Sequence, residues 1–296
     1  MMRLAPDFRA ALKICIRLTL LGLGAAIGAE ALLKFSTYLW RLEHAGWIAP
    51  TDWKHWIYSG AYILSFGYVL RETLHQHKET SLGLGSWRLP ARNLIFPFVV
   101  SFTGLIIIKS ELGNFVQYFW SMPEWLLNQD KELLSHPMIA ALTVVVAGPL
   151  LEELFFRGVI LRRLLLTGTT KRAILISSFL FAVAHLNPWQ AASAFLGGLF
   201  LGWVYYRTRS LALCIAGHAL NNATSIYISN LPVKIPGFNT ENLPGLVSFQ
   251  PLWFNLIGLG LLVMGIRGFH RVAPPAAPQP ITSLKPEPLL LNPASG

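Results

Sequence analysis

The stretch from Met138 to Arg157 reads MIAALTVVVAGPLLEELFFR, an apolar run with two glutamates and an arginine near its end. A helix that crosses a bilayer takes about 20 predominantly apolar residues, so this stretch predicts a transmembrane helix that carries charge inside the membrane. Comparable apolar runs recur along the 296-residue chain, which is 53% hydrophobic and 13% charged. Soluble domains contain about 25% charged residues. The composition therefore predicts an all-α, polytopic transmembrane helix bundle.

We expect about eight transmembrane helices, separated by breaker signals such as Leu186-Asn187-Pro188. Their expected ranges are 14–33, 56–70, 93–108, 138–156, 173–186, 191–206, 211–228 and 251–266. The first apolar run is longer than a signal-peptide core of about 7 to 15 residues, so we expect it to be retained. Residues 1–272 would form one transmembrane domain, and the Pro-rich residues 273–296 a disordered cytoplasmic tail.

The net charge of +10 first suggests a nucleic-acid partner, but the Lys and Arg residues are scattered between apolar segments and form no basic stripe. We therefore predict that the protein binds no nucleic acid. Most of the 24 Lys and Arg residues fall in alternate connections between the expected helices. Because positively charged loops stay on the cytoplasmic side, this alternation predicts an even number of helices and both termini in the cytoplasm.

Charged side chains inside a membrane are costly, so each is a functional hypothesis with a partner to be named. Glu153 and Arg157 are four residues apart and can meet on one helix face, with the acid first, the favoured order for an ion pair. Glu152 points about 100° away from Glu153 and has no such partner, which suits a general base or acid. A simpler interpretation is that these charges only mark the cytoplasmic end of the helix. Glu30 either pairs with Lys34, four residues on, or lines a cavity.

Two further polar pairs lie on later expected helices. Phe181 and His185 are four residues apart at the end of one helix, and His218 and Asn222 share one face of another. A single histidine near a helix end is more often a packing or capping residue. A His/Asn face can equally join helices through hydrogen bonds.

In combination these polar positions point to chemistry. Peptide hydrolysis needs a group that takes a proton from water, a second that shares it, and donors for the developing oxyanion. Glu152, His185 and the His218/Asn222 pair offer these parts if the bundle encloses a hydrated cavity. The rival interpretation is a proton-coupled transporter in which Glu152, His185 and His218 form a proton relay. Transporters often contain repeated halves, and no repeat is visible in the sequence.

The motifs occur in order along the chain. They are Glu152-Glu153-Leu154-Phe155-Phe156-Arg157, Phe181-Ala182-Val183-Ala184-His185 and His218-Ala219-Leu220-Asn221-Asn222. This order resembles the EExxxR, FxxxH and HxxxN pattern of the CPBP intramembrane proteases, which include the type II CAAX prenyl endopeptidases and bacterial Abi proteins. The motif-bearing core covers residues 138–228. The resemblance implies an integral protein of a bacterial-type inner (cytoplasmic) membrane.

The resemblance also implies roles for single residues. Glu152 would activate water together with His185, and His218 and Asn222 would stabilise the oxyanion. Orienting or structural roles would fall to Glu153, Arg157 and Phe181.

We favour hydrolysis without a metal, because the motifs lack the helical HExxH arrangement of zinc proteases. A zinc site made of Glu152, His185 and His218, with one open position, is the alternative. The expected substrate is a membrane-embedded or lipidated peptide or protein, with a prenylated CAAX type as one option. A scaffold or immunity protein without turnover is a further alternative.

Overall fold

The structure is a computed structural model that describes residues 6–43, 52–76, 87, 91–229, 231–240, 242 and 246–272. This part of the chain is helical, with no strand in it. The α-helices are α1 (Pro6–Glu43), α2 (Asp52–Gln76), α3 (Arg92–Phe119), α4 (Glu124–Leu134), α5 (Pro137–Ala140), α6 (Gly148–Glu153), α7 (Arg162–Thr167), α8 (Thr170–Ala184), α9 (Pro188–Thr208), α10 (Leu211–Ser229) and α11 (Leu252–Val272). Two π-helices, η2 (Ala141–Ala147) and η3 (Leu154–Leu161), interrupt the run from α5 to α7. The expected tail, residues 273–296, lies outside the described residues.

All eight segments expected from hydropathy coincide with helices, although α8 ends at Ala184, two residues before the expected end at 186. Within the described ranges, four continuous helices are long and apolar enough to cross a membrane, namely Phe8–Leu39, Arg92–Phe119, Pro137–Leu166 and Leu252–Val272. In contrast, α8 has 15 residues, fewer than the about 20 that a full span takes. The number of membrane crossings and the cytoplasmic placement of both termini stay predictions.

One helix, α4, lies outside the expected set. Its sequence, EWLLNQDKELL, is too polar and too short for hydropathy to mark as a span. Lys54 of α2 binds Glu132 of α4 at 2.8 Å, and this hydrogen bond holds the pKa of the Glu132 carboxyl below its usual range. Trp125 of α4 is exposed and Leu126 is buried. Thus α4 packs against the bundle with one face only.

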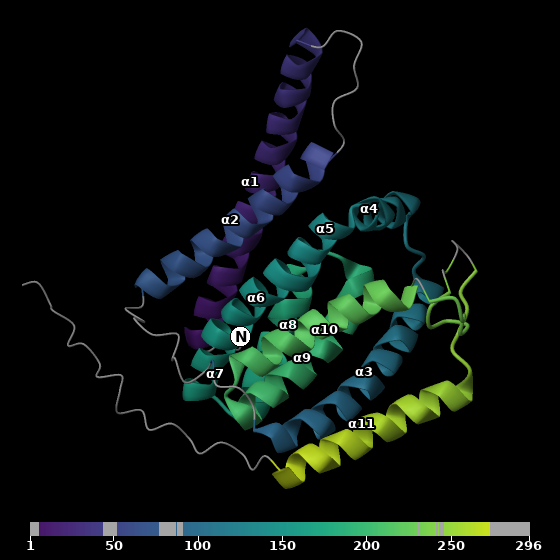
Figure 1. The fold of residues 1–296 in the computed structure, drawn as a ribbon. Helices are drawn as coiled ribbons and strands as arrows, with labels where there is room; N and C mark the ends of the chain where they lie inside the picture. Colours follow the sequence, from purple (N-terminus) through teal and green to yellow (C-terminus); the bar gives the residue numbers. More distant parts are fainter. Residues whose placement is uncertain are drawn as a thin grey trace, which may run out of the picture.

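Figure 1 shows the helices in three groups. α1 and α2 pack along each other and project from one side of the molecule, whereas α3 and α11 lie side by side on another. Between these pairs, α8, α9 and α10 pack around the continuous run from α5 to α7. The middle group carries every motif residue.

α3 and α11 approach each other closely because small residues line their contact. A methyl group added at Gly104 of α3 would collide with the backbone of Gly258 and Leu262, and one added at Gly265 would collide with Ser101. Small residues at membrane helix contacts permit this approach of two backbones. The α3–α11 pair is therefore held by direct backbone packing.

The helix that carries the two glutamates differs from the regular helix expected over 138–156. The helical run continues to Thr167, and α6 lies between the π-helices η2 and η3. Pro149 has no backbone N–H to donate to an α-helical ladder, and the Gly148 N–H donates to the Thr143 carbonyl, five residues back. π-helical turns are frequent at functional sites. Here they flank the segment that presents both carboxylates.

Candidate active site

A buried ion pair joins the helices of the site. Glu153 and Arg157 are 0% and 1% exposed, and Arg157 Nη1 lies 2.8 Å from Glu153 Oε1. The same oxygen lies 2.9 Å from His218 Nδ1 of α10. Arg157 Nη2 also donates to the Gly198 carbonyl of α9, at 3.3 Å. The ion pair predicted from the spacing is thus confirmed, and it connects the glutamate helix to α9 and α10.

The ring of Phe181 packs between the arginine and both motif histidines. The Arg157 guanidinium lies 4.6 Å from the ring centroid. The ring also meets His185 and His218 edge to face, with centroids 4.7 Å and 5.7 Å apart. Contacts of these kinds contribute roughly 0.5 to 2 kcal/mol each. The ring of Phe181, the aromatic residue of the second motif, therefore contacts all three charged or polar side chains at once.

The orientation of the His185 ring is set by the backbone at the end of α8. Its Nδ1 lies 2.8 Å from the Phe181 carbonyl oxygen. Because a carbonyl only accepts, the neutral ring carries its proton on Nδ1 and leaves the Nε2 lone pair facing the site. Leu186 follows with a left-handed φ of 51°, and Asn187 caps α9 by accepting from two backbone N–H groups of its first turn. This tight turn holds His185 in place.

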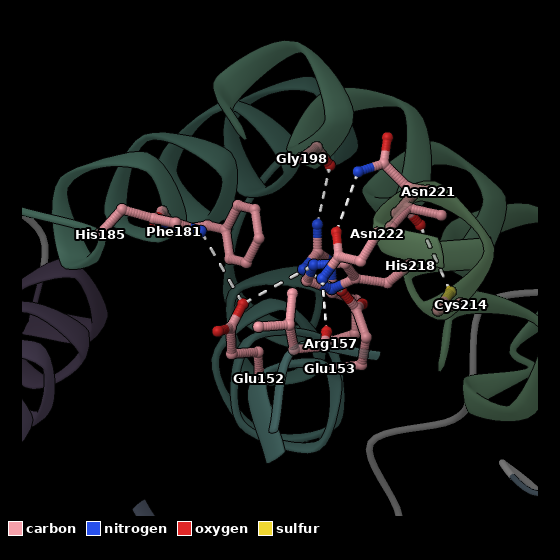
Figure 2. A network of polar contacts seen from close by, with 12 residues as sticks. Glu152, Glu153, Arg157, Phe181, His185, Gly198, Cys214, His218, Asn221 and Asn222 are labelled. Atoms are coloured by element: carbon pink, nitrogen blue, oxygen red, sulfur yellow. Dashed lines mark hydrogen bonds and ion pairs between the residues drawn. The ribbon is translucent and has the colours of Figure 1, made fainter. Parts of the chain in front are cut away.

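Contacts from three helices meet at the Glu152 carboxylate. Its Oε2 lies 3.9 Å from His185 Nε2 and 3.9 Å from His218 Nε2, and Figure 2 shows both contacts meeting at one oxygen. Oε2 is buried and accepts no hydrogen bond from the described protein groups. A separation of 3.9 Å is too long for a direct hydrogen bond but suits a bridging water molecule. Oε1 accepts a 2.7 Å hydrogen bond from the Tyr62 hydroxyl.

Asn222 lies one helical turn beyond His218, and its side chain is engaged on both sides. Its Nδ2 donates to the Val144 carbonyl of η2 at 2.8 Å, and its Oδ1 accepts from Asn221 at 3.0 Å. Asn221 Oδ1 in turn accepts from Lys109 Nζ at 3.0 Å. Lys109 follows the expected helix end at residue 108, yet it lies inside α3. The structure therefore adds to the site a lysine within a candidate membrane span, which hydropathy does not assign to the site.

A cavity of about 540 Å³ lies between α1, α2 and the motif helices. Apolar side chains make up most of its wall, and Glu152, Phe156 and His185 lie on the motif side. This volume is typical of small-molecule pockets. We expected one pocket to hold all four catalytic candidates. The cavity is lined by Glu152 and His185, whereas His218 and Asn222 are not among its lining residues.

The family model described as type II CAAX prenyl endopeptidase Rce1-like matches residues 134–224. Over this region the chain is similar to the CAAX protease family. The three motifs all lie within the matched residues. The chain matches no curated protein and no solved structure.

Similarity to the CAAX protease family indicates protease activity. Together with the apolar helices, it indicates an integral membrane protein. Proteins of this family act on membrane-associated substrates. Two residues that contact the family motifs, Tyr62 and Lys109, lie outside the matched region. A single tyrosine or lysine in or beside an apolar run gives no sequence signal that would connect it to a distant motif.

The CAAX protease motif residues Glu152, His185 and His218 form the alternative zinc set. A tetrahedral zinc ion with bonds of about 2.0 to 2.2 Å would hold its ligand atoms roughly 3.4 Å apart. The observed separations from Glu152 Oε2 to the two Nε2 atoms are 3.9 Å. Over the described ranges, no group of three or more His, Cys, Asp or Glu residues is placed to hold a metal ion. These separations are wider than a bound zinc ion would hold them, and the choice between metal-free and zinc-dependent hydrolysis stays a prediction.

Glu30 lies apart from the CAAX protease motifs. Lys34 Nζ is 3.4 Å from its Oε1, as the four-residue spacing predicts, and the Tyr58 hydroxyl donates to its Oε2. Tyr58 lines the same cavity as Glu152. Glu30 thus pairs with Lys34 and Tyr58 beside the cavity.

Proposed function

We propose that this protein is an intramembrane endopeptidase that hydrolyses a peptide bond with water activated by Glu152 and His185. The observation that supports this most is the approach of His185 Nε2 and His218 Nε2 to one oxygen of Glu152, each at 3.9 Å. A water molecule within about 2.8 Å of these atoms fits between them. Such a water has both an acceptor for its proton and a group that orients it.

The chemistry follows from these positions. Glu152 Oε2 takes a proton from the water as the water oxygen attacks the carbonyl carbon of the scissile peptide. A C–O bond forms, and the carbonyl π electrons move to oxygen to give a tetrahedral oxyanion. The proton then passes from Glu152 to the peptide nitrogen and the C–N bond breaks, which releases a carboxylic acid and an amine. His185 orients the water by accepting its second hydrogen at Nε2.

His218 and Asn222 are the proposed donors to the oxyanion. The Glu153 carboxylate, 2.9 Å from His218 Nδ1, fixes the ring with Nε2 toward Glu152 Oε2; as an imidazolium, His218 would donate from Nε2 to an anion. Asn222 uses one amide hydrogen for the Val144 carbonyl and retains a second. Loss of one oxyanion donor typically lowers kcat by about 10² to 10³. His218→Ala and Asn222→Leu should each fall in this range.

The cavity supports a substrate with a large apolar group. Its wall is mostly apolar and reaches Glu152 and His185 directly, so a group bound there would lie next to the activated water. An apolar chain that already lies in the bilayer can enter such a cavity because the wall is as apolar as the surrounding lipid, and van der Waals packing supplies the attraction. We therefore propose a membrane-embedded or lipidated peptide, with a prenylated CAAX-type peptide as the first substrate to test.

The activity test uses the full chain in proteoliposomes with a fluorogenic CAAX peptide, in farnesylated and unmodified forms. Glu152→Gln should abolish cleavage while the monodisperse yield stays at the wild-type level. Glu124→Gln, an exposed position on α4, is the matched control and should cleave normally. Cleavage that survives Glu152→Gln would contradict the proposal. Proton flux without cleavage would instead support a transporter, and neither activity would support a scaffold or immunity protein.

The proposed mechanism requires no metal. A membrane-permeant zinc chelator should therefore leave the cleavage rate unchanged. Loss of activity that zinc alone restores would overturn this part of the proposal and return Glu152, His185 and His218 to the zinc alternative.

A further inference from the structure

The Tyr62 hydroxyl reaches the motif glutamate from a helix outside the family-matched region. Tyr62 belongs to α2, and its hydroxyl donates a 2.7 Å hydrogen bond to Glu152 Oε1. Hydrogen bonds to an ionised carboxylate are shorter and stronger than those between neutral groups. Tyr62 and Glu152 also line the same cavity. Tyr62, on the α2 side of the cavity, thus binds the carboxylate of Glu152, which lies on the motif side.

This hydrogen bond gives the two oxygens of Glu152 separate environments. The last torsion of a glutamate side chain is broad and two-fold, so an untethered carboxylate would sample many orientations. With Oε1 bound to Tyr62, Oε2 is the oxygen that lies 3.9 Å from both imidazole Nε2 atoms. We propose that Tyr62 is a positioning residue for the hydrolysis, which keeps Glu152 Oε2 directed at the water site. The proposal rests on the function proposed for Glu152.

Packing of the ring does not account for the hydroxyl contact. The Tyr62 ring lies 5.0 Å from the Phe66 ring on the same helix, and a phenylalanine at position 62 would keep that contact. The hydroxyl alone bonds to Glu152. Tyr62→Phe therefore removes the hydrogen bond to Glu152 and leaves the packing of the ring in place.

The test compares Tyr62→Phe with Tyr68→Phe in the proteoliposome assay with the farnesylated peptide. Tyr68 lies on the same helix and is 56% exposed, so it is a matched control for loss of a tyrosine hydroxyl. Tyr62→Phe should lower kcat by about 10- to 100-fold, the range of a hydrogen bond to a charged group. Its KM should stay within about twofold of wild type, because the substrate-facing ring is retained. Tyr68→Phe should match wild type in both constants.

A second measurement separates positioning from folding. Replacement of Tyr62 by 3-fluorotyrosine keeps the size of the ring and changes the acidity of the hydroxyl. The acidic limb of the kcat–pH profile should then move, because the donor to the carboxylate has changed. If Tyr62→Phe gives little folded protein, the 3-fluorotyrosine variant is the deciding test. An acidic limb at the wild-type pH would then overturn the positioning role of Tyr62.

The outcomes distinguish this proposal from the proposed function. If the wild type cleaves and Glu152→Gln does not, a wild-type kcat for Tyr62→Phe overturns only the role of Tyr62. An equal loss of kcat in Tyr62→Phe and Tyr68→Phe also overturns it. If the wild type itself does not cleave the peptide, both proposals fail. A selective loss of kcat at position 62 supports the positioning role.

Discussion

Glu153 Oε1 lies 2.9 Å from His218 Nδ1, so a fully buried carboxylate of the first motif holds the histidine of the third. The same oxygen binds Arg157 at 2.8 Å. The charges of the two motifs therefore depend on each other. Removal of one partner leaves a charge inside the bundle without compensation.

Arg157→Gln should lower both the folded yield and the activity. Breaking a buried ion pair by removing one partner costs about 3–5 kcal/mol, because the remaining charge is stranded. Detergent-extracted yield on size-exclusion chromatography and the thermal denaturation midpoint measure the effect. Arg267→Gln, on an exposed position of α11, is the control and should behave as wild type. Full yield with lost activity would instead place Arg157 in chemistry or substrate binding.

Phe181→Leu should reduce both activity and stability. Leucine would keep most of the buried apolar volume but would lose three ring contacts of roughly 0.5 to 2 kcal/mol each, so the stability loss should be about 1.5 kcal/mol or more. The contacts of the ring with Arg157 and both histidines would be lost, and a small displacement of catalytic groups can lower the rate by about 100-fold. Phe179→Leu, a 56% exposed position on the same helix, supplies the comparison. Equal activity of the two variants would show that Phe181 only fills space.

Lys109→Met should lower kcat because Asn221 would lose its donor and the Asn221–Asn222 pair would lose its orientation. Asn221→Leu should cause a similar loss. Because the two residues act in one hydrogen-bonded chain, the double variant should be no worse than either single variant by more than about 0.5 kcal/mol in transition-state free energy. Steady-state kinetics of the four proteins complete the cycle. Additive losses would mean that Lys109 acts independently of the asparagine pair.

Gly265→Ala should separate α11 from α3, since a methyl group there would collide with the Ser101 backbone. Overpacking of this kind typically costs about 1–3 kcal/mol, and a collision with backbone is hard to relieve. Gly260→Ala is the control on the same helix, because its new methyl group would meet nothing within 4 Å. A lower denaturation midpoint is expected for Gly265→Ala alone. Equal midpoints would show that the two helices can move apart without cost.

Relations along one helix could be predicted from the sequence. The pairing of Glu153 with Arg157 and of Glu30 with Lys34 follows from a four-residue spacing, and both pairs are present in the structure. The helical segments follow from hydropathy in the same way. The polar helix α4 and the π-helical turns around α6 could not be predicted, because neither changes the apolar pattern that marks a membrane helix.

The sequence by itself determined the membrane class of the protein and the order of its motifs, and it indicated the residues that we propose to carry chemistry. These depend on composition and on short spacings, which a single chain displays directly. Only the tertiary structure decided that Tyr62 of α2 binds Glu152 and that Lys109 of α3 binds the asparagine pair. It also decided that α1 and α2 form a wall of the cavity. The physical reason is that contacts between distant helices depend on how the helices pack, and isolated polar residues in apolar segments carry no periodic signal of their partners.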